Sequence, residues 1–380
     1  MNWKVPFTTL TIGPEEEEAV LRVLRRGWLT MGPEVEAFEN EFAEALGSKF
    51  GIATANATDG LAMAYDAVGV GPGDEVAMPA LTFVAAMNVA LRRNAKPILI
   101  DITSEDDLTL SAKDLREKAG PKTRLIVPMP YGGFAPDMDG IMDVAHKLRI
   151  SVIEDACHAV LGTHKGKTLG TFGDAGVFSF FGNKNMTTGE GGMVVTNDQA
   201  IAQRCRQMRN HGITKGTYAR HQRKFEQYDV LVAGHNFRMC EVIAAMGREQ
   251  LRKVGEANKR RGIIAERVRE AVTAKCPEMR FPFTGHDRGV SSHHLLAAIL
   301  PEGVERDDFM YRLCEKGIQT SIHYRPLHRF AHTSGLWEEP PHLPVLESIE
   351  ERLISLPLGP GFTDEQVDLI VSATLHALRC

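Results

Sequence analysis

The chain has 380 residues, of which 43% are hydrophobic and 24% are charged. This composition excludes a disordered chain, and the length fits a large domain plus a smaller one. The net charge of −5, without a long Lys/Arg run, argues against a nucleic-acid partner. The six cysteines have no metal-ligand spacing, so we expect reduced thiols and no metal site. With no long apolar run, the sequence predicts a cytoplasmic protein that is not in a membrane.

Residues 15–250 are predicted to form a large α/β domain, because short apolar runs alternate with amphipathic segments. The expected strands are Phe50–Ala53, Glu75–Met78, Pro97–Ile102, Arg124–Pro128, Ser151–Glu154, Gly176–Phe180 and Gly192–Thr196. The expected helices between them are Leu61–Val68, Val84–Arg93, Ala112–Lys118 and Met138–Leu148. This alternation predicts a mostly parallel central sheet with helices on both faces.

Residues 251–380 are predicted to form a smaller C-terminal α+β domain. The segment Met239–Val272, rich in Ala, Arg and Glu, is expected to lead into it as one long helix or two consecutive ones. Strands are expected at Ser292–Leu300 and Gln319–Tyr324, with helices near Asp307–Lys316 and Asp364–Leu378.

Several side chains with related chemistry lie at the ends of predicted strands or helices. Asp155 ends an apolar strand, and ligands of open α/β sheets bind beyond such carboxyl ends. Ser179 and Lys184 lie in one strand-to-turn element, and Thr58 leads into a predicted helix. A carboxylate for a pyridine nitrogen, a lysine for a Schiff base, and hydroxyls and amides for a phosphate are what pyridoxal 5′-phosphate (PLP) needs. Together these residues indicate a PLP site.

Each of these residues also has an ordinary structural interpretation. Lys184 could be a solvated surface charge, and Asp155 could cap a helix. Ser179 could be a strand serine bonded to backbone, and the segment around Thr58 could only begin a helix. Residue types and spacing alone leave these alternatives open.

Longer motifs add a resemblance to a known family. They include Asp155-Ala156-Cys157-His158, the run from Gly170 to Phe180, the run from Asn183 to Gly192, Gly234-His235-Asn236-Phe237-Arg238 and Ile322-His323-Tyr324-Arg325-Pro326-Leu327-His328. These motifs resemble the DegT/DnrJ/EryC1/StrS family, and the similarity covers almost the whole chain. Members are fold-type I PLP enzymes that act mainly on nucleotide-linked keto-sugars.

The resemblance implies a role for each matching residue. Lys184 would form the Schiff base with PLP and then move the proton as general base, while Asp155 would face the pyridine nitrogen. His158 would lie beside the cofactor ring, and Phe83 would stack on its other face. The phosphate would be held by Thr58, Ser179, the backbone amide of Ala57 and, from the other subunit, Asn236. A homodimer with shared active sites is therefore expected.

The same resemblance predicts an aminotransferase that moves an amino group from glutamate to a nucleotide-linked keto-sugar of the 4-keto-6-deoxyhexose type. His323 and His328 match a motif near the substrate, but either could be structural. The basic residues Lys215, Arg220, Arg223 and Lys224 could meet a nucleotide diphosphate, or could simply face solvent.

Three alternatives remain at this point. One is an aminotransferase for a keto-cyclitol or another antibiotic precursor, which the sequence does not exclude. A PLP-dependent sugar dehydratase is disfavoured, because such members resemble this chain with histidine in place of Lys184. A non-catalytic regulatory protein of the same fold is disfavoured by the presence of both Asp155 and Lys184. Local motifs point to both GDP-linked and UDP-linked sugars, so no single sugar is named.

Overall fold

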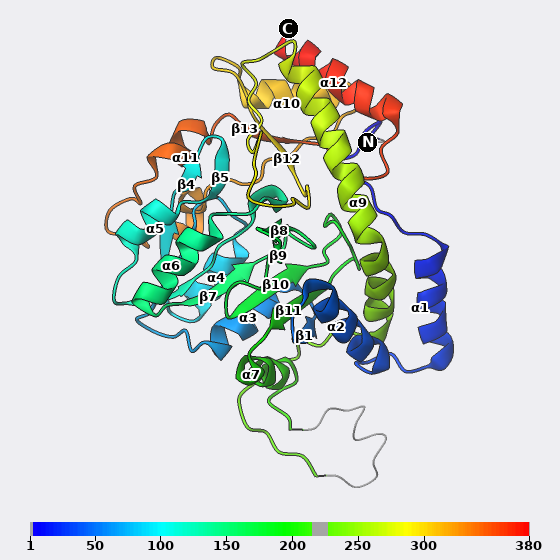
Figure 1. Ribbon diagram of the computed structural model, residues 1–380, viewed down its shortest axis with the longest axis vertical. Helices are drawn as coiled ribbons and strands as arrows, with labels where there is room; N and C mark the ends of the chain where they lie inside the picture. The colour runs from blue at the N-terminus through cyan, green and yellow to red at the C-terminus, as the bar shows by residue number, and fades with distance from the viewer. Residues whose placement is uncertain (1–2, 215–226, 380) are drawn as a thin grey trace.

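A seven-stranded sheet forms the centre of the computed structural model, which describes residues 3–214 and 227–379 (Figure 1). In spatial order its strands are β1 (Phe50–Thr54), β11 (Gly192–Thr196), β10 (Ala175–Ser179), β7 (Ser151–Asp155), β6 (Thr123–Ile126), β2 (Glu75–Pro79) and β3 (Lys96–Ile100). Within this sheet β11 runs antiparallel to β1 and β10, whereas the pairs from β10 to β3 are parallel. The predicted mostly parallel α/β sheet is confirmed.

Helices cover both faces of this sheet, because successive strand residues point to opposite sides. Ile153 and Val177 belong to a core shared with α3 (Ala57–Ala67), α4 (Ala85–Arg92) and α7 (Gln199–Arg209). Their neighbours Val152 and Phe178 belong to the opposite core, with α2 (Pro33–Leu46), α5 (Ala112–Lys118) and α6 (Met138–Leu148). The face that carries Ile153 and α3 is the one that holds the cavity described below.

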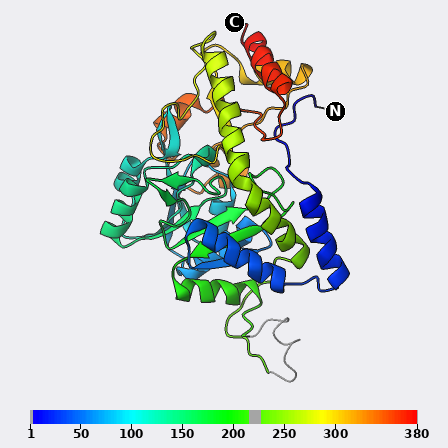
Figure 2. The same cartoon turned by 45° about the vertical axis from the view of Figure 1, so that its right-hand side comes forward.

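One long helix, α9 (Glu241–Thr273), runs from the sheet to the C-terminal part of the chain (Figures 1 and 2). Its 33 residues correspond to about 50 Å of continuous helix. At its start the buried Glu241 carboxylate accepts N–H groups of Gly32, Glu34 and Val35, which fixes the first turn of α2. The helix α1 (Pro14–Arg26) packs on α9 through Ala19 and Val23. Of the two alternatives for this segment, the structure has the single helix.

The C-terminal part contains a second core. It forms around the antiparallel pair β12 (Leu296–Ile299) and β13 (Leu353–Leu356), with α10 (Arg306–Glu315) and α12 (Asp364–Leu378). A shorter helix, α11 (Pro344–Ile349), packs against β4 (Ile102–Ser104). The division of the chain near residue 250 stays a prediction; that residue lies inside α9. No described helix is long and apolar enough to cross a membrane.

Two expected strands are wrong in extent or kind. Gln319–Tyr324 forms no strand. The backbone N–H of Gln319 donates to the carbonyl of Val5, whereas that of Ser321 donates to the carbonyl of Ser355 in β13. No continuous ladder of pairs with one partner therefore develops. Within Ser292–Leu300 only Leu296–Ile299 is a strand.

Local hairpins and helix ends account for the other differences. The segment Pro97–Ile102, expected as one strand, is interrupted after Ile100. Its last residue begins β4, which pairs antiparallel with β5 (Asp107–Leu110). A small hairpin, β8 (Thr163–His164) with β9 (Lys167–Thr168), was not expected. The helix expected from Leu61 begins at Ala57, because the Asn56 side chain accepts the N–H of Asp59 as an N-cap.

Candidate active site

A cavity of about 610 Å³ lies beyond the carboxyl ends of β7 and β10, next to the N-terminus of α3. It brings together eight residues that the sequence singled out: Ala57, Thr58, Phe83, Asp155, His158, Ser179, Lys184 and His323. They come from segments up to about 270 residues apart along the chain, so only the fold assembles them.

Asp155 is the last residue of β7 and is buried. It shares its face of the strand with Ile153, whereas Glu154 points to the other side and accepts N–H groups of Gly170, Phe172 and Gly173. Burial raises the pKa of the Asp155 carboxyl, while the nearby Cys157 and Lys184 oppose this. The carboxylate is therefore suited to a cationic partner, which would favour its charged form.

Lys184 reaches the same cavity from the loop between β10 and β11. Burial is the main cause that lowers the pKa of its amine, and the charges of Cys157 and Asp155 act in the opposite direction. A lowered pKa increases the fraction of neutral amine, which is the nucleophilic form. The fold thus prepares Lys184 to attack a carbonyl carbon.

An anion can bind where α3 begins. The backbone N–H groups of Ala57 and Thr58 are in the first turn of α3, where they have no intrahelical acceptor and carry the positive end of the helix dipole. Strand β11 approaches closely here: a Cβ on Gly192 would lie 2.7 Å from the Ala57 nitrogen, so a larger residue would displace the turn. The Ser179 hydroxyl accepts the N–H of Phe181 and still has its own proton to donate.

Aromatic and imidazole rings line the remaining walls. His158 is buried and its Nε2 lies 2.9 Å from the hydroxyl of Tyr324, whose ring is 5.9 Å from that of Phe83. Burial, with the charges of Lys184 and His323, lowers the pKa of His158 well below its usual value. His158 is therefore neutral at physiological pH.

His323 and His328, which the sequence placed together, are separated by the fold. His323 lines the cavity, with its Nδ1 3.0 Å from the Ser355 hydroxyl, and burial lowers its pKa to about 4. His328 does not line this cavity; its ring is buried and its Nε2 lies 3.6 Å from Glu347. A substrate contact by either stays a prediction.

Two further predictions concern Asn236 and a group of basic residues. Asn236 is exposed and forms an isolated bridge with Asn210. Its predicted role involves a second subunit and stays a prediction. The basic residues Lys215, Arg220, Arg223 and Lys224 lie outside the described residues.

Several lining residues were missed from the sequence. Tyr324, Cys157, Asn183 and Glu190 all line the cavity. The available signal was adjacency for Tyr324, Cys157 and Asn183, each within two residues of a residue that had been singled out. Glu190 lies six residues after Lys184, within the motif from Asn183 to Gly192. Among the described residues, no group of three or more His, Cys, Asp or Glu side chains is placed to hold a metal ion.

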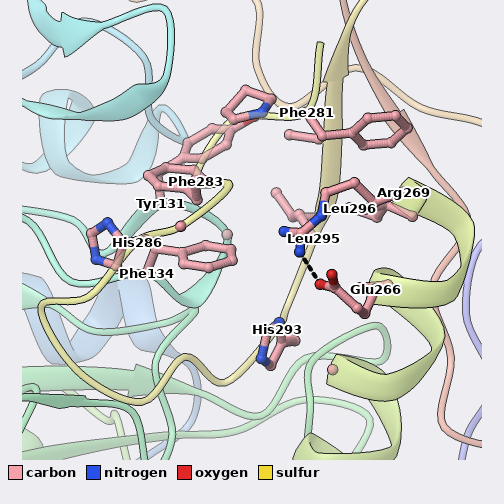
Figure 3. A pocket seen from close by; sticks show the side chains of 16 residues that line it. Tyr131, Phe134, Glu266, Arg269, Phe281, Phe283, His286, His293, Leu295 and Leu296 are labelled. Atoms are coloured by element: carbon pink, nitrogen blue, oxygen red, sulfur yellow. Dashed lines mark hydrogen bonds and ion pairs between the residues drawn. The ribbon is translucent and has the colours of Figure 1, made fainter. Parts of the chain in front are cut away.

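A second, smaller cavity of about 220 Å³ lies between α9 and the segment that leads into β12 (Figure 3). Aromatic rings form one side of it, and its charged residues Glu266 and Arg269 pair with each other. It contains none of the predicted site residues. Eight of the predicted site residues line the larger cavity instead.

Residues 10–375 match the family model described as the DegT/DnrJ/EryC1/StrS aminotransferase family. The chain belongs to this family. It is 35% identical to the spore coat polysaccharide biosynthesis protein SpsC of Bacillus subtilis, over all of this chain and 98% of that protein. The predicted family and the aminotransferase class are confirmed.

Solved structures of relatives agree with the fold. The Helicobacter pylori aminotransferase PseC, involved in the biosynthesis of pseudoaminic acid, has a TM-score of 0.91 at 26% identity, with 99% of each chain covered. The PLP form of the putative sugar aminotransferase Spr1654 of Streptococcus pneumoniae has a TM-score of 0.90 at 26% identity, covering 99% of this chain and 98% of that one. The predicted cofactor, PLP, and the predicted fold-type I architecture are both confirmed.

Proposed function

We propose that this sugar aminotransferase transfers an amino group from glutamate to a nucleotide-linked keto-sugar of the 4-keto-6-deoxyhexose type. The observation that carries the proposal is that Lys184 and Asp155 reach one cavity beside the first turn of α3. Relatives named for polysaccharide and pseudoaminic acid biosynthesis support a sugar as acceptor. Cys157, Cys205, Cys240 and Cys314 are free thiols, which supports the expected location in the cytoplasm.

The residues of the cavity fit PLP group by group. Asp155 can meet a protonated pyridine nitrogen, because a buried carboxylate favours a cationic partner. The amides of Ala57 and Thr58, with the Ser179 hydroxyl, can receive the phosphate at the positive end of α3. We assign to Lys184 the covalent link with the cofactor.

The rings of the cavity can hold the cofactor between them. Phe83 and His158 both line the cavity, and we assign them to the two sides of the cofactor ring. The Tyr324 hydroxyl, 2.9 Å from His158, holds that imidazole in place. A neutral His158 adds no positive charge that would disfavour protonation of the ring nitrogen.

PLP supplies an electron sink that stabilises negative charge on the substrate carbon. Burial lowers the pKa of the Lys184 amine and so increases its neutral fraction, which would take the proton from that carbon. From the same position it would also return the proton, so one side chain would move the proton in both directions. The keto-sugar half of the reaction uses the same atoms in reverse order.

The visible absorption spectrum of the purified protein with PLP tests this proposal. We expect a band from PLP linked to lysine, which glutamate bleaches with release of one 2-oxoglutarate per site. A nucleotide-linked 4-keto-6-deoxyhexose should then restore the band. Bleaching by glutamate but restoration only by a keto-cyclitol would support the alternative acceptor, and the absence of any bleaching would contradict an aminotransferase that uses glutamate.

We also propose that the enzyme is a homodimer in which Asn236 completes the partner's cavity. Asn236 is exposed and does not line the cavity of its own chain. It lies close in sequence to Arg238, which bonds to Asn210, so the segment is held at the surface in a defined position.

Mixed dimers of Asn236→Ala and Lys184→Ala test the shared site. If Asn236 acts across the interface, each mixed dimer has one intact site, and random mixing should restore about a quarter of wild-type activity. If Asn236 acts within its own chain, every site in a mixed dimer lacks one residue and activity stays at the level of the single variants. Size-exclusion chromatography with light scattering checks that the variants exchange subunits.

A further inference from the structure

Asn185, the residue after Lys184, is buried and its amide is engaged on both sides. Its Nδ2 donates to Asn258 Oδ1 at 2.7 Å and to the Ser292 carbonyl at 2.6 Å. Its Oδ1 lies 2.9 Å from Nδ1 of His294. A backbone carbonyl can only accept a hydrogen bond, so the Asn185 amide must direct its Nδ2 to Ser292 and its Oδ1 to His294. Because Oδ1 is an acceptor, Nδ1 of His294 must be the donor and carry the proton.

His294 in turn packs directly on His158. The two ring centroids are 4.2 Å apart and the rings are tilted by 40°. Burial, with the charges of His158 and Lys184, holds the pKa of His294 well below its usual value, so the ring is neutral. The Ser292 hydroxyl also donates to the backbone carbonyl of His158. The segment 292–294 therefore holds both the backbone and the ring of His158.

Helix α9 provides the common support. Asn258, on α9, accepts from Asn185 and donates its own Nδ2 to the Val160 carbonyl at 2.9 Å. It thereby joins the loop that carries Lys184 to the segment that follows His158. Lys184 itself lies in a loop without helix or strand, so its position depends on such contacts.

We propose that a buried polar network positions Lys184 and His158 relative to each other and thereby sets the rate of proton transfer. The network consists of Asn185, Asn258, Ser292 and His294. None of these four residues lines the cavity, so they are positioning residues and not catalytic ones. The inference rests on the proposed function, because that function assigns the covalent link with the cofactor and the proton transfer to Lys184.

Asn185→Ala and His294→Ala test the network through the spectrum of bound PLP. Each change leaves space that water can enter near Lys184, which is otherwise buried. The PLP band reports the Lys184 nitrogen in its link with PLP, so altered solvation there should shift the pH midpoint of the band by about half a unit or more. We expect kcat to fall by about tenfold or more, with KM for glutamate changed by less than about threefold.

Gln250→Ala is the matched control. Gln250 is also buried on α9 and accepts the N–H of Thr187 in the same loop, but its other bonds go to Thr11 and Glu16. It should lower thermal stability without moving the PLP midpoint. His294→Asn provides the conservative variant, because its amide can still donate to Asn185, and it should retain more activity than His294→Ala.

The outcomes separate this inference from the proposed function. If the wild type shows no lysine-dependent band, the proposed function fails. A second outcome is that the wild type shows the band while both alanine variants fold by circular dichroism and have the same band midpoint and the same kcat as Gln250→Ala. In that case the network is only structural and the inference is overturned. If the alanine variants do not fold, His294→Phe takes their place in the same comparison, because its ring fills the space of His294 but cannot donate to Asn185.

Discussion

Replacement of Lys184 by alanine is expected to lower the rate of transamination by at least about 10⁴-fold. The side chain is proposed both to link the cofactor and to move the proton, so its loss removes a covalent step and a general base together. The amine also has a lowered pKa because it is buried, and no other lysine lines the cavity among the described residues. The measurement is the rate of 2-oxoglutarate formation from glutamate, with the visible spectrum recorded in parallel.

Lys165→Ala is a suitable control, because Lys165 is exposed and pairs with Asp139 at the protein surface. It should keep the rate and the spectrum of the wild type. A small primary amine added to Lys184→Ala should restore part of the activity if the lost group is a base. A Lys184→Ala variant that kept more than about a hundredth of the wild-type rate would contradict the role proposed for this lysine.

The central sheet and part of the site could be predicted because their signals are local. An apolar run that ends in a carboxylate, as at Asp155, is visible in five residues, and parallel strands present such ends at one edge. The start of α3 was harder to locate, because Asn56 to Gly60 have the composition of a loop. There the Asn56 side chain bonds to the Asp59 N–H and lets the helix begin before its apolar residues do.

Long-range contacts explain what could not be predicted. Tyr324 meets His158 although 166 residues separate them in the sequence, and no local pattern around Tyr324 indicates this partner. The segment Gln319–Tyr324 has the composition of a strand, but its backbone hydrogen bonds go to two different partners, Val5 and Ser355. His328 follows His323 by five residues, and the 3₁₀ turn η2 (Leu327–Arg329) carries it away from the cavity to Glu347. Such outcomes depend on which distant segments pack together.

Asp155→Asn is expected to lower the transamination rate by about 100- to 1000-fold. Asparagine has nearly the same shape as aspartate, so the packing at the end of β7 should survive. It cannot supply the negative charge that keeps a ring nitrogen protonated, and the electron sink weakens without that proton. The measurements are kcat for the glutamate half-reaction and the affinity for PLP, which should change much less than kcat.

Glu154→Gln distinguishes a loss of this charge from a general effect of neutralising a buried carboxylate on β7. Glu154 is as buried as Asp155, yet it points away from the cavity and binds three backbone N–H groups. Its replacement should cost about 1–3 kcal/mol of unfolding free energy, because one amide oxygen cannot accept all three bonds. The rate of the folded protein should stay near wild type. Equal losses of rate in both variants would show that the strand tolerates neither change, and the assignment of Asp155 to the cofactor would lose its support.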